Sequence, residues 1–281
     1  MSAGPTTGPT TAQTTPLVRV RGLSRDYRLP REHLFAPAPV HHAVRGVDLD
    51  VFDGDAVAII GESGSGKSTL VRTMLALDEA SAGTVEFDGR AVQQGSAASL
   101  HWFRSQTGIV FQDPYSSLDP RQSIGRIISE PLRALGDAVG DVRDHRALVH
   151  EALEHVGLHT WRAKQYPHEL SGGQRQRVAI ARAIVHRPRL LVGDEALSAL
   201  DVTIRAQILE LLRRLRAELG LTIVFVSHDI GLVQHLCNRV AVMHDGRIVE
   251  VGDTDAVLET PQHPYTAALL AAVPTLIERT A

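Results

Sequence analysis

The sequence predicts an α/β fold with a mainly parallel β-sheet, and three observations lead to it. Short apolar runs typical of buried strands alternate with helical patterns after Pro188, an order that favours parallel strands. Helical patterns dominate between about Arg121 and Arg187, which indicates an inserted helical subdomain. The sequence holds no internal repeat, so we expect a single unit of this kind.

The composition is that of an ordinary globular chain. Its 281 residues are 43% hydrophobic and 22% charged, which is enough to bury a core. The 29 Lys and Arg residues against 32 Asp and Glu residues give a net charge of −3, without the basic excess of nucleic-acid binders. The single cysteine, Cys237, excludes an internal disulfide framework and any metal site built from cysteines. No apolar run approaches the ~18 residues that span a bilayer, so we expect a soluble protein that works at a membrane only through a partner.

The first part of the chain is expected to form β-structure. Residues 1–16 are Thr, Gly, Pro, Ala and Ser with no acid or base, and we expect a disordered head there. A strand is predicted at Leu17–Arg21, with an irregular stretch from there to His42. Two turn dipeptides then predict two hairpins, one at Asp53-Gly54 between Val47–Phe52 and Ala56–Ile60, and one at Asp88-Gly89.

The remaining elements follow from apolar periodicity. Strands are predicted at Gly108–Phe111, Leu190–Gly193, Thr222–Ser227 and Arg239–Met243. Helices are predicted at Lys67–Leu77, Ala147–Val156, Gln174–Val185, Thr203–Leu219, Ile230–Cys237 and Thr266–Ala272.

A glycine-rich loop lies between the strand Ala56–Ile60 and the helix that begins at Lys67. It fits the pattern G-x-x-x-x-G-K-[ST] with its residues Gly61, Glu62, Ser63, Gly64, Ser65, Gly66, Lys67, Ser68 and Thr69. Glycines let the backbone wrap phosphates, and N–H groups at a helix N-terminus attract anions. Lys67 is expected to reach the β- and γ-phosphates of ATP, and Ser68 to bind Mg²⁺. The alternative is a turn that binds nothing; it is disfavoured because Lys67 is one of only two lysines.

Two acids end the strand at residues 190–193. Asp194 and Glu195 follow an apolar run, and the carboxyl end of a parallel strand is where α/β sheets place ligand chemistry. Asp194 is expected to hold Mg²⁺ through water, and Glu195 to orient or deprotonate the attacking water. Alternatively, both acids cap the following helix.

The pentapeptide Leu170–Gln174 provides a second anion-binding helix N-terminus. With the two preceding motifs in this order, the chain resembles the ATP-binding cassette (ABC) proteins from Leu17 to about Pro274. The resemblance implies a P-loop NTPase core with a mainly parallel sheet, an N-terminal antiparallel β subdomain and an inserted α-helical subdomain. The implied divisions are a head at 1–16, a nucleotide-binding domain at 17–260 with its helical subdomain at about 113–187, and a tail at 261–281.

The resemblance also implies roles for single residues. Gln112 matches the glutamine that touches Mg²⁺ or the attacking water and adjoins the membrane partner, and His228 matches the histidine that contacts the γ-phosphate. Asp201 would cross a dimer interface. Tyr27 is the candidate for stacking on adenine, with Phe35 as the competitor. The signature residues would bind the nucleotide held by a second cassette; they are Ser171, Gly172, Gly173 and Gln174.

Finer features are similar to the peptide/nickel branch of ABC importers. They are the segments Phe111–Pro120 and Ser198–Gln207 and the tail motif His263-Pro264-Tyr265-Thr266 with Ala272-Val273-Pro274. Ala196 stands where the family usually has proline, which leaves the cargo open.

The resemblance implies an ATP-hydrolysing subunit of a di- or oligopeptide importer on the cytoplasmic face of the cell membrane. The alternatives are import of nickel or a metal chelate, or a separate cassette of an exporter. The implied partners are integral-membrane permease subunits, a second ATPase subunit in a homodimer or heterodimer and, indirectly, an extracytoplasmic substrate-binding protein. No nucleic-acid partner is expected.

Overall fold

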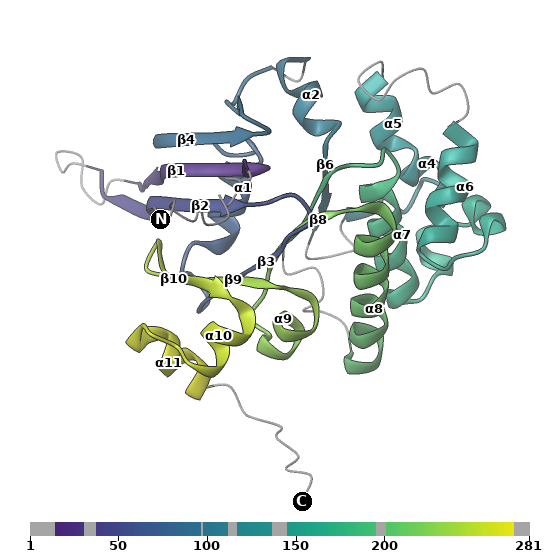
Figure 1. Ribbon diagram of the computed structural model, residues 1–281. Helices are drawn as coiled ribbons and strands as arrows, with labels where there is room; N and C mark the ends of the chain where they lie inside the picture. The colour runs from purple at the N-terminus through teal and green to yellow at the C-terminus, as the bar shows by residue number, and fades with distance from the viewer. Residues whose placement is uncertain are drawn as a thin grey trace, which may run out of the picture.

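Two β-sheets form the centre of the protein (Figure 1). The computed structural model describes residues 15–30, 38–96, 98–111, 117–136, 145–194 and 201–272. The antiparallel sheet has the order β2-β1-β4-β5, formed by β1 (Val18–Arg28), β2 (Val40–Val51), β4 (Ala82–Phe87) and β5 (Arg90–Ala91). The larger sheet has the order β10-β9-β3-β8-β7-β6, formed by β3 (Ala56–Ile60), β6 (Thr107–Val110), β7 (Leu190–Asp194), β8 (Thr222–Val226), β9 (Arg239–His244) and β10 (Arg247–Asp253).

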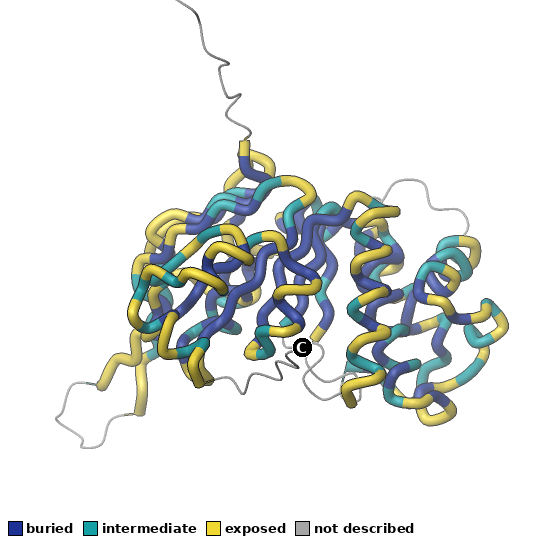
Figure 2. The backbone as a smooth tube through the Cα atoms, turned by 60° about the horizontal axis from the view of Figure 1, so that its bottom comes forward, coloured by how far each residue is buried: buried dark blue, intermediate teal, exposed yellow. Residues whose placement is uncertain are grey.

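The larger sheet is parallel from β9 to β6, and β10 alone runs antiparallel to its neighbour β9. The strands from β9 to β6 are apolar on both faces, as parallel sheets require when both faces are covered. In β3, Ala56, Ala58 and Ile60 belong to one core cluster, whereas Val57 and Ile59 belong to the other. The strands therefore separate two cores and lie in the dark blue centre of Figure 2.

Helices cover one face of this sheet, and α1 (Lys67–Met74) with the antiparallel sheet covers the other. A helical group lies to the right in Figure 1 and consists of α4 (Ile124–Ile128), α5 (Glu130–Leu135), α6 (His145–His155), the 3₁₀ turns Thr160–Lys164 and Pro167–Glu169, and α7 (Gly172–Ile184). The other helices are α2 (His101–Arg104), preceded by a 3₁₀ turn at Ala98–Leu100, α8 (Val202–Leu219), α9 (Ile230–Leu236), α10 (Thr254–Glu259) and α11 (Pro264–Ala271). The predicted α/β architecture with its helical insertion is confirmed.

The hairpin predicted at Asp53-Gly54 is wrong. A turn does lie there, but it leads from β2 in one sheet to β3 in the other. β2 pairs with β1 from Val51 back to Val40, and β3 lies between β8 and β9. Each strand thus has its own partners, so the turn connects two layers.

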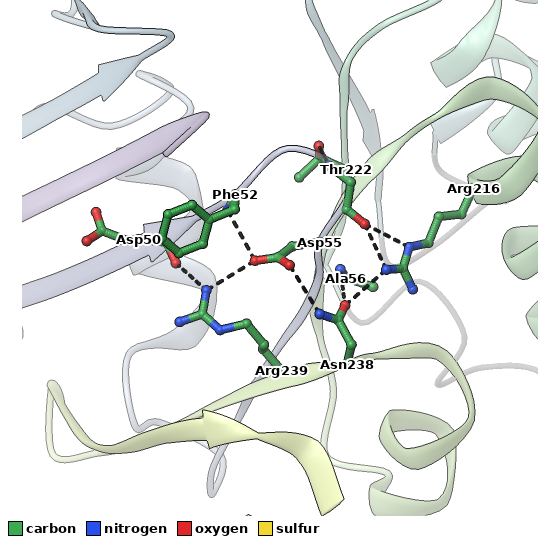
Figure 3. A network of polar contacts seen from close by, with 9 residues as sticks. Asp50, Phe52, Asp55, Ala56, Arg216, Thr222, Asn238 and Arg239 are labelled. Carbon is green, nitrogen blue, oxygen red and sulfur yellow. Dashed lines mark hydrogen bonds and ion pairs between the residues drawn. The ribbon is translucent and has the colours of Figure 1, made fainter. Parts of the chain in front are cut away.

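A polar network explains how this turn is held (Figure 3). The Asp55 carboxylate accepts hydrogen bonds from the Phe52 N–H at 3.1 Å and from the Arg239 guanidinium at 3.1 Å. The Arg216 guanidinium donates to the Gly54 carbonyl at 2.7 Å. These contacts bind the turn to α8 and β9 at the amino end of β3, opposite the edge where the phosphate loop begins.

The irregular stretch predicted up to His42 is also wrong in its described part. β1 continues to Arg28 and β2 begins at Val40, and the two strands stay paired as far as Arg28 opposite Val40. The register shifts twice between Leu23 and Asp26, and such irregularities hide the alternation that a sequence pattern depends on. β10 and α10 were not predicted; residues 31–37 lie outside the description.

Candidate functional site

The phosphate loop leaves the carboxyl end of β3 and enters α1. Gly61 follows the last residue of β3, and Lys67 is the first residue of α1. Gly66 is the N-cap of α1 with φ of 103°, and no side chain caps this helix end. The first-turn N–H groups have no partners within a helix, so this end is suited to bind an anion.

Two glycines let the loop lie directly against neighbouring strands. A Cβ atom at Gly61 would lie 2.1 Å from the Met243 carbonyl oxygen of β9, and one at Gly66 would lie 2.2 Å from the Ala43 carbonyl oxygen of β2. Only glycine fits at either position, and the left-handed φ of Gly66 adds to the requirement. The Ser65 hydroxyl is buried without a hydrogen-bond partner among the described residues. A phosphate group fits this loop in shape and in polarity.

Lys67 is buried within the loop, with 5% of its surface exposed. Its ammonium group donates to the Gly61 carbonyl at 2.9 Å and to the Glu62 carbonyl at 2.7 Å. These bonds close the loop around the lysine side chain and place a positive charge at its centre. The loop thereby carries both of the features that attract phosphate, a cation and a helix N-terminus.

Ser68 and Asp194 are brought together at the same edge of the sheet. The Ser68 hydroxyl donates to the Asp194 carboxylate at 2.8 Å. Asp194 ends β7, which is separated from β3 by β8 alone, so the parallel order explains their meeting across 126 residues of sequence. A hydroxyl and a carboxylate are oxygen ligands of the kind that Mg²⁺ takes beside a nucleotide. The pair therefore fits the predicted Mg²⁺ site.

His228 stands at the carboxyl edge of the sheet, two residues beyond β8, and is exposed. Its neighbours fix the backbone there. The Ser227 hydroxyl accepts from the Asp229 N–H at 2.9 Å, and the Asp229 carboxylate accepts from the Leu232 N–H at 3.2 Å as the N-cap of α9. The histidine therefore emerges from a short rigid turn on the edge that also holds the phosphate loop.

The signature segment begins α7. Ser171 is the N-cap, its hydroxyl accepts from the Gln174 N–H at 3.4 Å, and the Gln174 side chain accepts from the Ser171 N–H at 3.1 Å. This is a capping box. Gly173 is buried against Ile204 of α8, and a Cβ atom there would lie 2.8 Å from the Ile204 side chain. Ser171 itself is exposed, so the helix end faces away from the core.

Asp201 is the N-cap of α8, and its carboxylate accepts from the Ile204 N–H at 2.9 Å.

Tyr27 lies on β1 and is paired with His41 of β2. Two residues beyond His41 on the same strand is Ala43, whose carbonyl lies against Gly66 of the phosphate loop. The Tyr27 hydroxyl donates to Asp78 at 3.1 Å, and the Arg25 guanidinium lies over its ring at 4.6 Å. A stacking role for Tyr27 stays a prediction.

Four residues named in the sequence analysis lie outside the described residues. They are Phe35, Gln112, Glu195 and Ala196. Their roles therefore stay predictions.

Residues from the end of the chain also reach the loop, which the sequence analysis missed. The Gly246 N–H donates to the Ser65 carbonyl at 3.0 Å, and the Tyr265 hydroxyl accepts from the Glu62 N–H at 3.2 Å. The only signal was the tail motif at residues 263–266, which marks a branch of a family without indicating a contact. In the part of the chain that the structure describes, no helix is long and apolar enough to cross a membrane.

Comparison with known proteins agrees with this geometry. Residues 44–198 match the family model described as ABC transporter, and residues 249–281 match the model described as oligopeptide/dipeptide transporter, C-terminal region. The glutathione import ATP-binding protein GsiA of Escherichia coli K12 is 48% identical over 262 residues, and that of Salmonella paratyphi A is 47% identical over 260 residues. Each alignment covers 92% of this chain and 41% of the relative, so the chain spans less than half the length of these relatives.

Solved structures share the fold. The dimeric post-hydrolysis state of the ATP-binding cassette MJ0796 bound to ADP and Pi has a TM-score of 0.71 at 29% identity, covering 84% of this chain and 98% of the other. The cassette cbiO1 of Clostridium perfringens has a TM-score of 0.73 at 30% identity, covering 88% and 92%. With its phosphate loop, its Ser68–Asp194 pair and its capped signature helix, the chain belongs to the ABC transporter family.

Proposed function

We propose that this chain is the ATP-binding and ATP-hydrolysing subunit of an importer for short peptides, working on the cytoplasmic face of a membrane. The observation that carries the proposal is the pairing of the Ser68 hydroxyl with Asp194 beside Lys67. It supplies, at one edge of one sheet, a cradle for phosphate and oxygen ligands for the metal that accompanies it.

The chain's own residues divide the work. The backbone of residues 61–69 and the Lys67 ammonium would bind the β- and γ-phosphates, and Tyr27 would stack on the base. Ser68 and Asp194, with Gln112, would hold Mg²⁺, which when bound neutralises charge on the phosphate oxygens. His228 would contact the γ-phosphate.

Glu195 would orient or deprotonate the attacking water. This assignment follows from its place in the sequence directly after Asp194, which ends β7 at the edge of the sheet where the phosphate loop begins.

The signature helix would complete the site of a second cassette. Ser171 is exposed, and its described hydrogen bonds stay within its own capping box and helix, so this end supports contact with a nucleotide held by another chain. Asp201, the exposed N-cap of α8, would lie at the same interface. ATP would favour the closed pair because its γ-phosphate adds contacts that exist only there.

The cargo proposed is a di- or oligopeptide. Two findings support it, the match of residues 249–281 to an oligopeptide/dipeptide transporter region and the relatives named for glutathione import; glutathione is itself a small peptide. The chain would act with integral-membrane permease subunits and, through them, with an extracytoplasmic binding protein.

The ATPase part of the proposal is tested by the mass in solution of Glu195→Gln with Mg-ATP and with ADP, measured by light scattering. Removal of the catalytic acid should trap a closed dimer of twice 30.5 kDa with ATP and leave the monomer with ADP. Lys67→Ala is the matched control and should stay monomeric, without turnover, under both conditions. A wild-type chain that binds no nucleotide would contradict the proposal, whereas a monomer with ATP bound would indicate that the second cassette is a different protein.

The cargo is tested by uptake in cells that lack this chain. Labelled glutathione, a labelled dipeptide and nickel are compared after return of the wild-type chain or Lys67→Ala. Peptide uptake restored by the wild-type chain alone would support the proposal. Restoration of nickel uptake alone would replace the peptide with a metal cargo.

A further inference from the structure

The phosphate loop is in contact with a helix near the end of the chain. The Tyr265 hydroxyl, on α11, accepts a hydrogen bond of 3.2 Å from the backbone N–H of Glu62, across 203 residues of sequence. None of the roles proposed above uses this tyrosine. The contact is made to the backbone of the loop, so it acts on the conformation of the cradle.

Tyr265 is itself held by two direct contacts, and the residues just before it are anchored to β10. Its ring stacks on the His244 ring with centroids 3.8 Å apart. Its N–H donates to the His263 ring nitrogen at 3.2 Å, which caps the start of α11. The Glu250 carboxylate of β10 accepts from the Gln262 N–H at 2.8 Å and from the His263 N–H at 3.1 Å. The tail motif thereby serves to fix the position of one hydroxyl group.

The charge on Glu250 is secured by these same bonds. Partial burial raises the pKa of Glu250, but the hydrogen bonds that its carboxylate accepts outweigh this, and the pKa lies below its ordinary value. The anchor of the tail is therefore ionised at neutral pH, when it accepts hydrogen bonds most strongly.

The loop residue that Tyr265 holds is also the one that Lys67 holds. The Glu62 carbonyl accepts from the Lys67 ammonium at 2.7 Å, while the Glu62 N–H donates to Tyr265. Both polar groups of the Glu62 main chain are thus fixed, one by the lysine and one by the tail. Further along the loop, the Gly246 N–H donates to the Ser65 carbonyl at 3.0 Å. The backbone of the loop is therefore held at Ser65 by Gly246 and at Glu62 by Tyr265.

We propose that Tyr265 is a positioning residue for nucleotide binding, which holds the phosphate loop in its binding conformation through the Glu62 N–H. The inference rests on the proposed function, because it assigns a nucleotide to this loop. A cradle ordered before its ligand arrives loses less entropy on binding. A single hydrogen bond contributes about 0.5–1.5 kcal/mol, so loss of the hydroxyl should weaken nucleotide binding about threefold to tenfold.

The experiment is equilibrium binding of Mg-ADP, followed with a fluorescent ADP analogue, together with steady-state ATP hydrolysis. Tyr265→Phe removes the hydroxyl and keeps the ring on His244. Its Kd for Mg-ADP and its KM for ATP should rise about threefold to tenfold with kcat within about twofold, because the loop binds the phosphates of substrate and transition state alike. Tyr166→Phe is the matched control; this tyrosine also stacks on a histidine, His168, and its loss of hydroxyl should leave the affinity at the wild-type value.

The outcomes separate the two claims. A wild-type chain that binds no Mg-ADP would remove the proposed function itself. If the wild-type chain binds and Lys67→Ala does not, the function stands, and Tyr265→Phe alone decides the inference. An affinity in Tyr265→Phe equal to or tighter than wild type would overturn it. An equal loss of affinity in Tyr166→Phe would also overturn the inference, because removal of any tyrosine hydroxyl would then have the same effect.

Discussion

The N-terminal ends of α1 and α7 are both predicted to bind phosphate, but they are held in different ways. The end of α1 has a glycine cap and no capping side chain. The loop before it packs against β9 at Gly61 and against β2 at Gly66, so closely that neither position has room for a Cβ atom. Tyr265 also contacts this loop. The end of α7 is closed by its own Ser171 and Gln174.

This difference shows how much of each site one chain contains. The phosphate loop depends on contacts from β2, β9 and α11, and it holds Lys67 and Ser68, with the Asp194 carboxylate of β7 beside it. The capping box of the signature end is formed by two residues of local sequence, Ser171 and Gln174, and Ser171 is exposed. A nucleotide site that combines the two helix ends therefore takes the phosphate loop from one chain and the exposed signature end from the other.

The largest expected effect tests whether tertiary contacts shape the loop. Gly66→Ala places a Cβ atom 2.2 Å from the Ala43 carbonyl, whereas Gly64→Ala places one in open space; both positions have positive φ, of 103° and 82°. Gly66→Ala should lower the free energy of unfolding by about 3 kcal/mol, from overpacking added to backbone strain. Gly64→Ala should lower it by only about 1 kcal/mol, from the strain alone.

Chemical denaturation of both variants measures this difference. If the two losses were equal, contact with β2 would not determine the shape of the loop.

The second prediction concerns the exposed half. Ser171→Arg should leave the Kd for Mg-ATP within about twofold of wild type, because each chain keeps its own phosphate loop. Turnover should fall about 100-fold, the scale seen when a group that stabilises transition-state charge is removed. The change also removes the helix cap, at about 1 kcal/mol of stability. Isothermal binding and a phosphate-release assay measure the two quantities.

Mixing two inactive variants sharpens this test. Ser171→Arg combined with Lys67→Ala rebuilds one complete site in a mixed dimer, from the Lys67 of one chain and the Ser171 of the other. Turnover should return in the mixture and in neither variant alone. Loss of nucleotide binding in Ser171→Arg by itself would contradict a site shared between chains.

The sequence predicted elements best where the pattern is local. β3 is predicted to the residue and α8 to within one, because an apolar run or a helical stripe is complete within each. The place of Asp194 followed from the same cause, since it ends a strand that is buried and parallel.

Long-range pairing explains what the sequence could not predict. The Asp53-Gly54 turn looks the same whether it closes a hairpin or joins two layers; the partners of β2 and β3 decide between them. β10 is only half-buried and carries little apolar alternation. The contact of Tyr265 with Glu62 depends on where α11 packs after the whole chain has folded.

The smallest expected effect concerns the far end of α1. There, Asp78 accepts hydrogen bonds from Arg72 of α1 and from Tyr27 of β1. The bonds from Arg72, with that from Tyr27, outweigh partial burial and hold the pKa of Asp78 below its ordinary value of 3.8. Because this pKa is lowered on folding, the carboxylate stabilises the fold above about pH 4 and loses this effect as the pH falls through the folded value.

Asp78→Asn should therefore lower the free energy of unfolding by about 1 kcal/mol at pH 7, with a difference from wild type that shrinks below about pH 4. Denaturation between pH 7 and pH 3 measures it. Glu210→Gln is the control, because its carboxylate beside Arg213 is 75% exposed. Nucleotide affinity should stay within about twofold in Glu210→Gln. A difference that is constant with pH would show that Asp78 acts through packing, and the charge would then play no part in fixing α1 to β1.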